Sequence, residues 1–597
     1  MKRERNRRRH LPDGGFLFLL PSLLGIGCFY LLPFLLIVGW SFLEDPFRRT
    51  FTGLENYAAL LRSAAFRLAL KNTLLFLGGA VLSAVALSLA LALLLRALTP
   101  ASRLLRAVLV FPLTVPVVTV VLLATLLLDW HGVLNGLLGL LKLAPADWLD
   151  GVRARRSMLL LYLWKHCGLY ALLFLAALET VPGEEREAAA LDGAGAARTF
   201  LFIELPHLLP AFLFVALVSL FFGFRFFREI SLLEGRYPTS SLYMLQHFMR
   251  NVFALLDYQK TCAAAVLLFL MAALALGLPA ALLRRRGGAE FLSLADGPGF
   301  GPGRKHPAAA ATVILLLLLP GLLPTLVTLV HSLAGEAELA GRYARALKQL
   351  GAQEGPVRLL LFPAEPSLRA YRELWKDGTL LRAFGRSLLY TLPALAVQLP
   401  VAVCAAWGFN RLRGRLRDGL LLTYLVLLLL PWEVTLVPNF LVARFLGFLE
   451  TPWAVWLPSA FSPLPVYLLT KELERLPAGL REAAALDGAG EARTLTQVLL
   501  PNLRPALGAV LLLDFIDLWN AVELPRTLLR RAELLPLSVT LGELRPEDPL
   551  GPVFAASFLY MLPPLLLFLP LFGLRRGDGP PDRRRGRRAD ASAGGGE

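Results

Sequence analysis

Charged residues are scarce in this sequence. Asp, Glu, Lys and Arg make up 18% of its 597 residues, whereas hydrophobic residues make up 56%. Soluble domains carry about 25% charged residues, so this composition excludes an ordinary soluble enzyme. The long apolar runs and the mean hydropathy of +0.60 instead predict a polytopic membrane protein.

Cysteine and histidine are also sparse, with four and seven copies. None is spaced like the ligands of a zinc or iron–sulfur site, so we expect no metal site. The sequence has no GxxxxGK[ST] phosphate-binding loop. We therefore expect no bound cofactor and no catalytic residue in this chain, and any ATP and Mg²⁺ would be bound by a partner.

Twelve apolar stretches approach or exceed the roughly 20 residues needed to cross a bilayer. The first half has six, near residues 16–40, 72–97, 104–129, 157–180, 207–228 and 261–283, and the second half has six, near 312–331, 386–409, 418–442, 452–471, 506–524 and 551–573. The first stretch is too long for a signal-peptide core and lacks a small-x-small cleavage site, so we expect it to remain as a span. The fold class predicted is all-α, with about twelve transmembrane helices in two parallel six-helix repeats.

Basic residues cluster at the start (MKRERNRRRH), at residues 284–286 and at 583–588, within a net charge of +17. With six spans in each half, these clusters fall on one side of the membrane, which the positive-inside rule makes the cytoplasm. Such clusters are typical of anchors on anionic lipid, and we expect no nucleic-acid partner. The predicted division is a basic N-terminus (1–15), a first transmembrane domain (16–286), a Gly/Pro-rich linker (287–310), a second transmembrane domain (311–574) and a basic disordered tail (575–597).

The decapeptide REAAALDGAG occurs twice, at residues 186–195 and again at 481–490, an offset of 295 residues. In each copy a proline precedes a short helix, which an Asp-Gly pair should end because glycine accepts the positive φ of a C-cap. Both copies follow the fourth span of their half, which predicts parallel and not inverted repeats. A well-capped turn does not require the same ten letters twice. The duplicated surface therefore predicts two copies of the partner that it contacts.

The run EAA, then DGA, then Leu-Pro and a second proline resembles the cytoplasmic coupling loop of ABC importer permeases, at residues 187–210 and 482–505. The DGA variant is similar to the carbohydrate-uptake branch, of the maltose and glycerol-phosphate type. FTGLENYAALL (51–61) and KNTLLF (71–76) resemble the first permease subunit of that branch. PSLRAYRELW (366–375) and FIDLWN (515–520) resemble the second, as if both were fused in one chain.

The resemblance implies a permease in the bacterial cytoplasmic membrane with both termini in the cytoplasm. Its partners would be two cytoplasmic ABC ATPase subunits and an extracytoplasmic solute-binding protein, and the two halves would import a carbohydrate by alternating access. The implied coupling residues are Glu187, Ala188, Ala189, Asp192, Gly193, Arg198 and Pro206, with Glu482, Ala483, Ala484, Asp487, Gly488, Arg493 and Pro501.

Ferric-iron and thiamine importers also fuse two such halves, so these or other small solutes remain alternatives. A membrane-embedded enzyme is disfavoured because no acidic dyad stands out. An ion-coupled secondary transporter is disfavoured because it would predict inverted repeats.

Polar residues at bilayer depth are costly and indicate functional sites. Arg225 and Asn520 each follow the second proline of their loop by 15 residues, about 22 Å of helical rise. The predicted substrate path comprises Arg225, Arg228, Glu229, Asp517, Trp519 and Asn520, with Lys165, His166, Asp514 and Glu523 as weaker candidates. Trp519 would stack on a sugar face. The alternative, slightly favoured, is that Arg225 pairs with Glu229 at i, i+4 and that Trp519 belongs to an aromatic belt.

Overall fold

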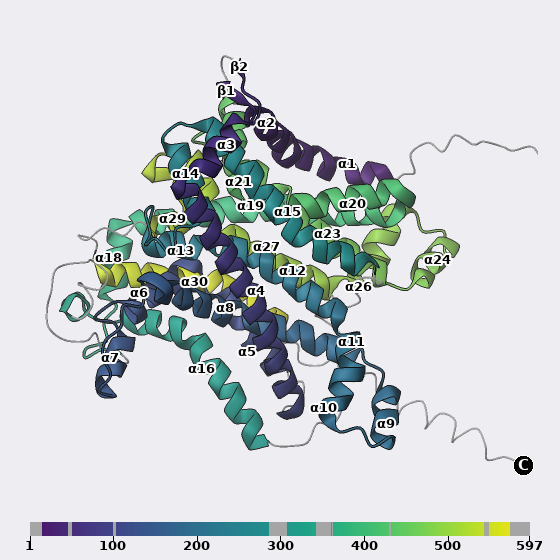
Figure 1. Ribbon diagram of the computed structural model, residues 1–597, viewed down its shortest axis with the longest axis horizontal. Coiled ribbons are helices and arrows are strands. Elements are labelled where there is room, and N and C mark those ends of the chain that lie inside the picture. The colour runs from purple at the N-terminus through teal and green to yellow at the C-terminus, as the bar shows by residue number, and fades with distance from the viewer. Residues whose placement is uncertain are drawn as a thin grey trace, which may run out of the picture.

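The computed structural model describes residues 15–45, 50–98, 103–285, 307–341, 360, 362–428, 432–542 and 549–572. This part of the chain is almost entirely helical (Figure 1). Its only strands, β1 (Leu43–Asp45) and β2 (Thr50–Phe51), form a small antiparallel hairpin. The all-α prediction is confirmed.

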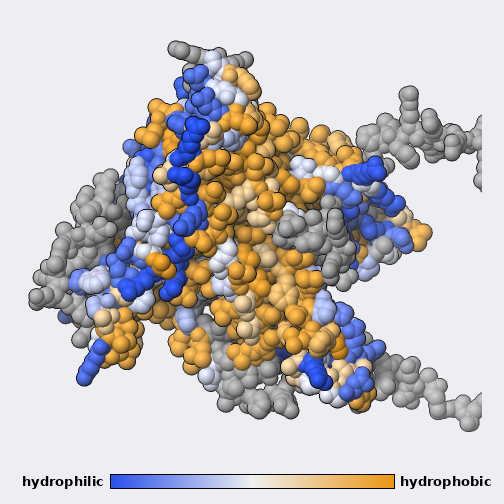
Figure 2. Space-filling view, viewed as in Figure 1, coloured by the Kyte–Doolittle hydropathy of each residue, from blue (hydrophilic) through white to orange (hydrophobic). Residues whose placement is uncertain are grey.

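Within the described residues, eight helical segments are long and apolar enough to cross a membrane. They are Gly15–Trp40, Ala64–Arg96, Val117–Leu140, Gly151–Glu179, Leu209–Glu234, Tyr258–Ala275, Thr379–Arg411 and Leu550–Phe568. The four other predicted spans also lie on helices, which are shorter, interrupted or described only in part: α16 (Pro307–Ser332), α20 (Gly414–Leu428) with α21 (Trp432–Phe445), α22 (Pro452–Ala460) with α23 (Pro463–Arg475), and α27 (Arg504–Trp519). Figure 2 shows a broad hydrophobic surface between more hydrophilic ends, as a bilayer requires.

The first span of each half packs in part against the opposite half. The helix α1 (Gly15–Ile26) of the first half packs along α19 (Thr379–Arg411) of the second, and α16 of the second half packs on α5 (Arg103–Thr114) and α6 (Val117–Leu128) of the first. A Cβ atom added to Gly408 in α19 would lie only 2.7 Å from the carbonyl oxygen of Gly15. Glycine is needed at this crossing because membrane helices gain contact area by close backbone approach.

The repeats are parallel, as predicted. The helices α9 (Gly183–Leu191) and α24 (Ala478–Leu486) lie at the same end of the bundle, to the right in Figure 1, while α7 (Val133–Leu140) and α18 (Arg369–Asp377) lie at the opposite end. An inverted repeat would place the two loops at opposite ends.

The remaining described helices either form parts of these spans or connect them. They are α2 (Leu32–Trp40), α3 (Glu55–Arg62), α4 (Ala64–Leu98), α8 (Gly151–Glu179), α12 (Leu209–Arg225), α13 (Phe227–Glu234), α14 (Leu245–Ala254), α15 (Tyr258–Arg285), α28 (Glu523–Leu528), α29 (Leu537–Thr540) and α30 (Leu550–Phe572), with a π-helical turn at Gly27–Leu31 and a 3₁₀ turn at Ala532–Leu534. The first spans also contact their own halves, since α16 packs on α30 and α2 on α15.

One predicted boundary needs correction. The linker was expected over residues 287–310, but residues 307–310 belong to α16, which begins at Pro307. Proline is well suited to the first turn of a helix because its missing N–H has no partner there. The rest of the linker, residues 1–14 of the N-terminus and the tail at 575–597 lie outside the described residues.

Candidate functional site: two identical loops and a cavity between the halves

The two decapeptide copies form helices with the same bounds and the same termination. Each helix ends in a Schellman motif, in which two backbone N–H groups beyond the helix donate to carbonyls of its last turn. Ala194 N donates to Ala189 O at 2.9 Å and Gly193 N to Ala190 O at 3.1 Å; in the second copy the distances for the corresponding pairs, Ala489 to Ala484 and Gly488 to Ala485, are the same. Gly193 and Gly488 have φ of +76° and +73°. The predicted glycine caps are confirmed.

These two helices, α9 and α24, are called the docking helices here because the duplicated surface predicts a partner for each. Each docking helix turns one face inward and the other to solvent. Ala189 and Ala484 are buried, whereas the other described coupling residues are exposed: Glu187, Ala188, Asp192, Gly193, Arg198, Pro206, Glu482, Ala483, Asp487, Gly488, Arg493 and Pro501. Leu191 and Leu486, which the sequence analysis did not single out, are both 89% exposed. A large apolar side chain presented identically on two rigid helices is suited to contact a partner.

After each docking helix the chain winds as α10 (Ala196–Thr199) or α25 (Glu491–Arg493), then as a π-helical turn at Phe200–Glu204 or Thr494–Leu499. The next short helices, α11 (Leu205–His207) and α26 (Leu500–Asn502), contain Pro206 and Pro501. Proline cannot donate the i→i−4 hydrogen bond, and the wider π turn lies next to it in both halves. The equality of the two loops thus extends beyond the ten identical letters.

The attachments of the loops to the bundle differ. In the first half the buried Glu204 accepts two hydrogen bonds from Arg96 at the end of α4, at 2.8 and 3.0 Å, and lies 3.6 Å from Nε of Arg186. The corresponding position in the second half is Leu499. There Arg481 donates to Asn410 instead, and Arg411 pairs with Glu491 at 2.6 Å. Arg96 and Glu204 were not predicted from the sequence, although opposite charges at the ends of two apolar stretches could have indicated them.

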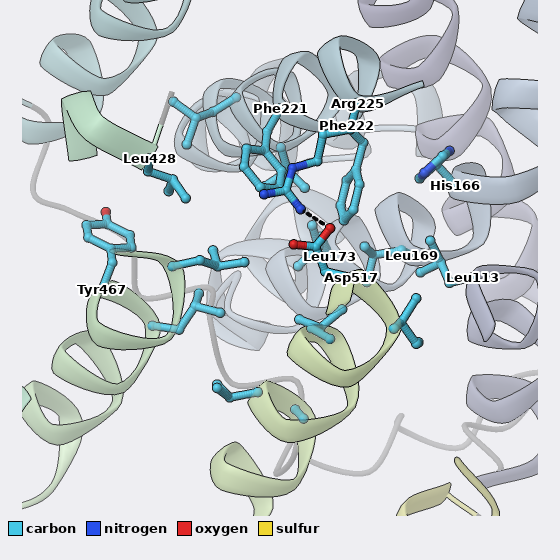
Figure 3. Close-up of a pocket in the computed structure, with 18 of the residues that line it drawn as sticks. Leu113, His166, Leu169, Leu173, Phe221, Phe222, Arg225, Leu428, Tyr467 and Asp517 are labelled. Carbon is cyan, nitrogen blue, oxygen red and sulfur yellow. Dashed lines mark ion pairs between the residues drawn. The ribbon is translucent and has the colours of Figure 1, made fainter. Parts of the chain in front are cut away.

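A cavity of about 230 Å³ lies between the halves. Its lining is mostly apolar, with leucine and phenylalanine the most frequent residues, and comes chiefly from α8, α12, α20, α23 and α27, with several charged groups (Figure 3). The lining residues nearest the coupling loop, Asn502 and Pro505, are exposed, whereas Arg228 and Glu229 at the other end are buried. The cavity therefore opens toward the coupling-loop end.

Arg225 and Asp517 meet across the boundary between the halves, with Nη1 and Oδ1 2.5 Å apart (Figure 3). The guanidinium of Arg225 also lies 4.3 Å from the centre of the Phe221 ring. Glu229 instead accepts a hydrogen bond from Lys165 at 2.6 Å. The alternative Arg225–Glu229 pair is wrong, because Arg225 is paired with Asp517 and Glu229 with Lys165.

Asn520 and Trp519 make packing contacts and hydrogen bonds at the wall of the cavity. Asn520 lines it, but its Oδ1 accepts a hydrogen bond from the Val117 N–H at 3.1 Å, capping α6 of the other half. Trp519 is 1% exposed, stacks on Phe515 and Tyr560, and donates to the Tyr560 carbonyl at 3.0 Å. In this conformation no face of Trp519 is available to a sugar.

Among the weaker candidates, Lys165 and His166 line the cavity, while Asp514 is buried behind it. Glu523 lies beyond the cavity and accepts a hydrogen bond from Arg228 at 3.0 Å. Within the described ranges no group of three or more His, Cys, Asp or Glu side chains is placed to hold a metal ion.

Comparison with known proteins gives the family. The model of the binding-protein-dependent transport system inner membrane component matches residues 83–287 and 398–574, together more than half of the chain. The chain is 33% identical over 219 residues to the arabinooligosaccharides transport system permease protein AraP of Bacillus subtilis, covering 36% of this chain and 70% of that protein. It is 27% identical over 235 residues to the diacetylchitobiose uptake system permease protein DasC of Streptomyces coelicolor, covering 38% and 84%.

Protein LplC of Bacillus subtilis is 30% identical over 199 residues, a match that covers 33% of this chain and 62% of LplC. A solved bacterial alginate ABC transporter in complex with an alginate pentasaccharide-bound periplasmic protein aligns with a TM-score of 0.40 and 21% identity, over 45% of this chain and 94% of that one. The double match to the family model agrees with the internal repeat. The chain therefore belongs to the family of binding-protein-dependent transport system inner membrane components, and carries two of its permease domains in one polypeptide.

Proposed function

We propose that this chain supplies both halves of the membrane permease of an ATP-driven carbohydrate importer. The halves would form one transport path, and two cytoplasmic ATPase subunits would each grip one docking helix. A solute-binding protein would deliver the sugar on the opposite side. ATP-driven closure of the ATPases would move the two helices together and expose the central cavity alternately to the two sides of the membrane.

The observation that carries this proposal is the equality of the two loops. The helices α9 and α24 share their bounds, their Schellman caps and an 89% exposed leucine. The contacts between the loops and the bundle do not explain why the two loops are alike, because these contacts differ. The first loop is attached by Arg96 with Glu204 and the second by Arg481 with Asn410. Two identical partners would select loops whose outer surfaces are alike even though their contacts with the bundle differ.

Carbohydrate is the solute class that the relatives support, since the related permeases take their names from arabinooligosaccharides and diacetylchitobiose. The cavity agrees with a polar solute. Arg225, Asp517 and Asn520 are among the hydrogen-bonding groups of a mostly apolar lining, the composition typical of small-molecule sites. The cavity opens toward the loop end, as in an importer waiting to release its solute inward.

The test is reconstitution of the purified chain in liposomes with its ATPase and binding-protein partners. We expect ATP-dependent uptake of a labelled oligosaccharide, and no ATP hydrolysis by the chain alone because it has no phosphate-binding loop. ATPase activity in a preparation free of any second polypeptide would contradict the proposal. Uptake of ferric iron or thiamine in place of the sugar would retain the transport mechanism and replace the substrate class.

The stoichiometry provides an independent check. Each ATPase needs one docking helix and the chain supplies two, so native mass spectrometry of the complex should give one permease chain to two ATPase chains. An assembly with two permease chains and two ATPases would show that each polypeptide offers only one working loop.

A further inference from the structure

A second, smaller cavity of about 50 Å³ lies beyond the central one, on the side away from the coupling loops. It is lined from α13, α14 and α28, which follow the far ends of α12 and α27. Arg228 lines both cavities, and its partner Glu523 lines the second. The two spaces thus lie end to end with charged side chains between them.

These charged side chains are two arginines of the first half and two acids of the second, here called the ion-pair bridge: Arg225, Arg228, Asp517 and Glu523. Asp517 receives both guanidinium groups, at 2.5 Å from Arg225 and 3.1 Å from Arg228, and Arg228 reaches on to Glu523 at 3.0 Å. The formal charges cancel. Every one of these pairs joins one half of the molecule to the other, so none survives a separation of α12 and α13 from α27 and α28.

We propose that the ion-pair bridge is the closed outer gate of the permease, the barrier that separates the central cavity from the side opposite the coupling loops. The inference rests on the proposed alternating-access function and goes beyond it by naming the barrier. With the bridge intact, solute in the central cavity can leave only toward the loop end. Separation of the halves would break the three cross-half contacts together and join the two cavities into one path.

The buried charges favour a gate that is either fully closed or fully open. Side-chain exposures of 9% for Arg228 and 13% for Glu523 mean that each charge has little water and depends on its partner. Breaking a buried pair without hydration is strongly unfavourable, so the bridge resists partial opening. Once water enters, the separated charges are solvated, and the open state is stabilised in turn. The gate therefore has two discrete states, as packed interfaces between moving bodies generally do.

The carboxylates allow a test with little change of shape. Asp517→Asn with Glu523→Gln replaces both acids by amides of the same size and removes the ion pairs. A reporter cysteine at Leu513, which lines the central cavity, is introduced after the four native cysteines have been replaced. The complete complex without ATP is then exposed to a membrane-impermeant maleimide in right-side-out and in inside-out vesicles.

With the bridge intact, we expect the reporter to react from the loop side and only slowly from the opposite side. In the double variant the reaction from the opposite side should be about tenfold faster or more, because coupling across buried charge pairs commonly exceeds that factor. Arg228→Lys, which keeps the positive charge, should remain slow, whereas Arg228→Gln should become fast. The matched control is Glu373→Gln, the same change in the exposed pair of Glu373 with Arg369 on α18, and it should leave labelling unaltered.

Unchanged labelling from the opposite side in the double variant would overturn the proposal. If that variant does not assemble, Glu523→Gln alone is measured in the same way, and an unchanged rate there overturns it equally. The labelling needs no ATP and no solute, so its outcome is separate from the proposed function. Faster labelling in a complex whose unmodified form shows no ATP-driven uptake would leave the gate in place and contradict the importer.

Discussion

The coupling loops and the cavity wall are two regions built from the same duplicated segment. The loop helices are alike in the two halves, whereas the corresponding positions in the cavity wall are different. The loop helices share their letters, bounds and caps, while their attachments to the bundle differ. Fifteen residues beyond the second proline of each loop, the first half has Arg225, which reaches across the boundary, and the second has Asn520, which caps α6. This is the pattern expected if the loops face like partners, as proposed, while the positions in the cavity wall face one shared, asymmetric space.

The largest effect is expected when the glycine cap that both loops share is removed. Proline at Gly193 and Gly488 fixes φ near −65°, whereas the caps need +76° and +73°. Local strain of this kind costs about 1 to 3 kcal/mol per site, or about fivefold to a hundredfold in affinity. The double variant should lose ATPase copurification and uptake while the chain still inserts in the membrane.

Gly183→Pro is the matched control, because Gly183 is the first residue of α9 and proline is accepted there. It should retain both the ATPase and uptake. Normal transport by the Gly193→Pro, Gly488→Pro double variant, with the ATPase bound, would show that these loops do not carry the coupling.

The next prediction concerns the asymmetric region. Arg225→Ala should raise the sugar concentration needed for half-maximal uptake, or abolish uptake, while ATPase assembly stays intact. The side chain lines the cavity, and its loss leaves Asp517 with Arg228 alone. Asn520→Ala should have a smaller effect on the same measurement, because the amide already serves the α6 backbone.

Arg198→Ala, in the exposed part of the first loop, is the comparison for Arg225→Ala. It should weaken ATPase copurification or coupling and not the apparent affinity for the sugar. Equal uptake curves for Arg225→Ala and the unmodified chain would make Arg225 a structural residue of the interface between the halves.

A smaller effect is expected from the exposed leucines. Leu191→Ser and Leu486→Ser each remove a side chain whose burial in a partner groove would contribute about 1.5 to 3 kcal/mol. Because the two helices are alike, the single variants should weaken ATPase binding equally in a titration of the purified complex. Leu140→Ser, at a leucine 79% exposed on α7 at the other end of the bundle, is the control. Unequal effects would mean that the two partners grip the loops differently.

The smallest effect should come from an attachment that only the first half has. Glu204→Gln removes the negative charge and one of the two oxygens that accept hydrogen bonds from Arg96, and a hydrogen bond to a charged group typically contributes about 1.5 to 3 kcal/mol. A thermal scan in detergent should show a lower apparent Tm by a few degrees, compared with Glu184→Gln at an exposed glutamate of the same loop. An unaltered Tm would indicate that Arg186 and Arg96 find other partners.

The sequence predicted the loops well because their structure is local. A proline, a short alanine-rich run and Asp-Gly specify a helix, its length and its cap within about ten residues, and the fold confirms each of these. The sequence predicted the membrane-embedded all-α class for a similar reason, since a helix that spans the bilayer is recognised from one continuous apolar run of sufficient length. It also placed Arg225, Arg228, Glu229, Asp517 and Asn520 around one cavity, although without their partners.

What the sequence could not indicate are contacts between residues far apart in the chain. Glu229 pairs with Lys165, 64 positions earlier in the chain, and Arg225 pairs with Asp517 of the other half. Trp519 stacks on Phe515 of its own helix and on Tyr560, and the contact with Tyr560 is one that no local pattern reveals.

The amino-acid sequence by itself therefore determined the membrane class, the parallel duplication and the two capped helices, all of which depend on neighbours within a few turns of chain. The tertiary structure alone decided that α1 and α16 contact helices of the opposite half, that the cavity opens at the loop end, and that two arginines of one half meet two acids of the other. The physical reason is that an ion pair between residues about 290 positions apart depends on how two packed bundles are set against each other, and side-chain charge alone does not specify that arrangement.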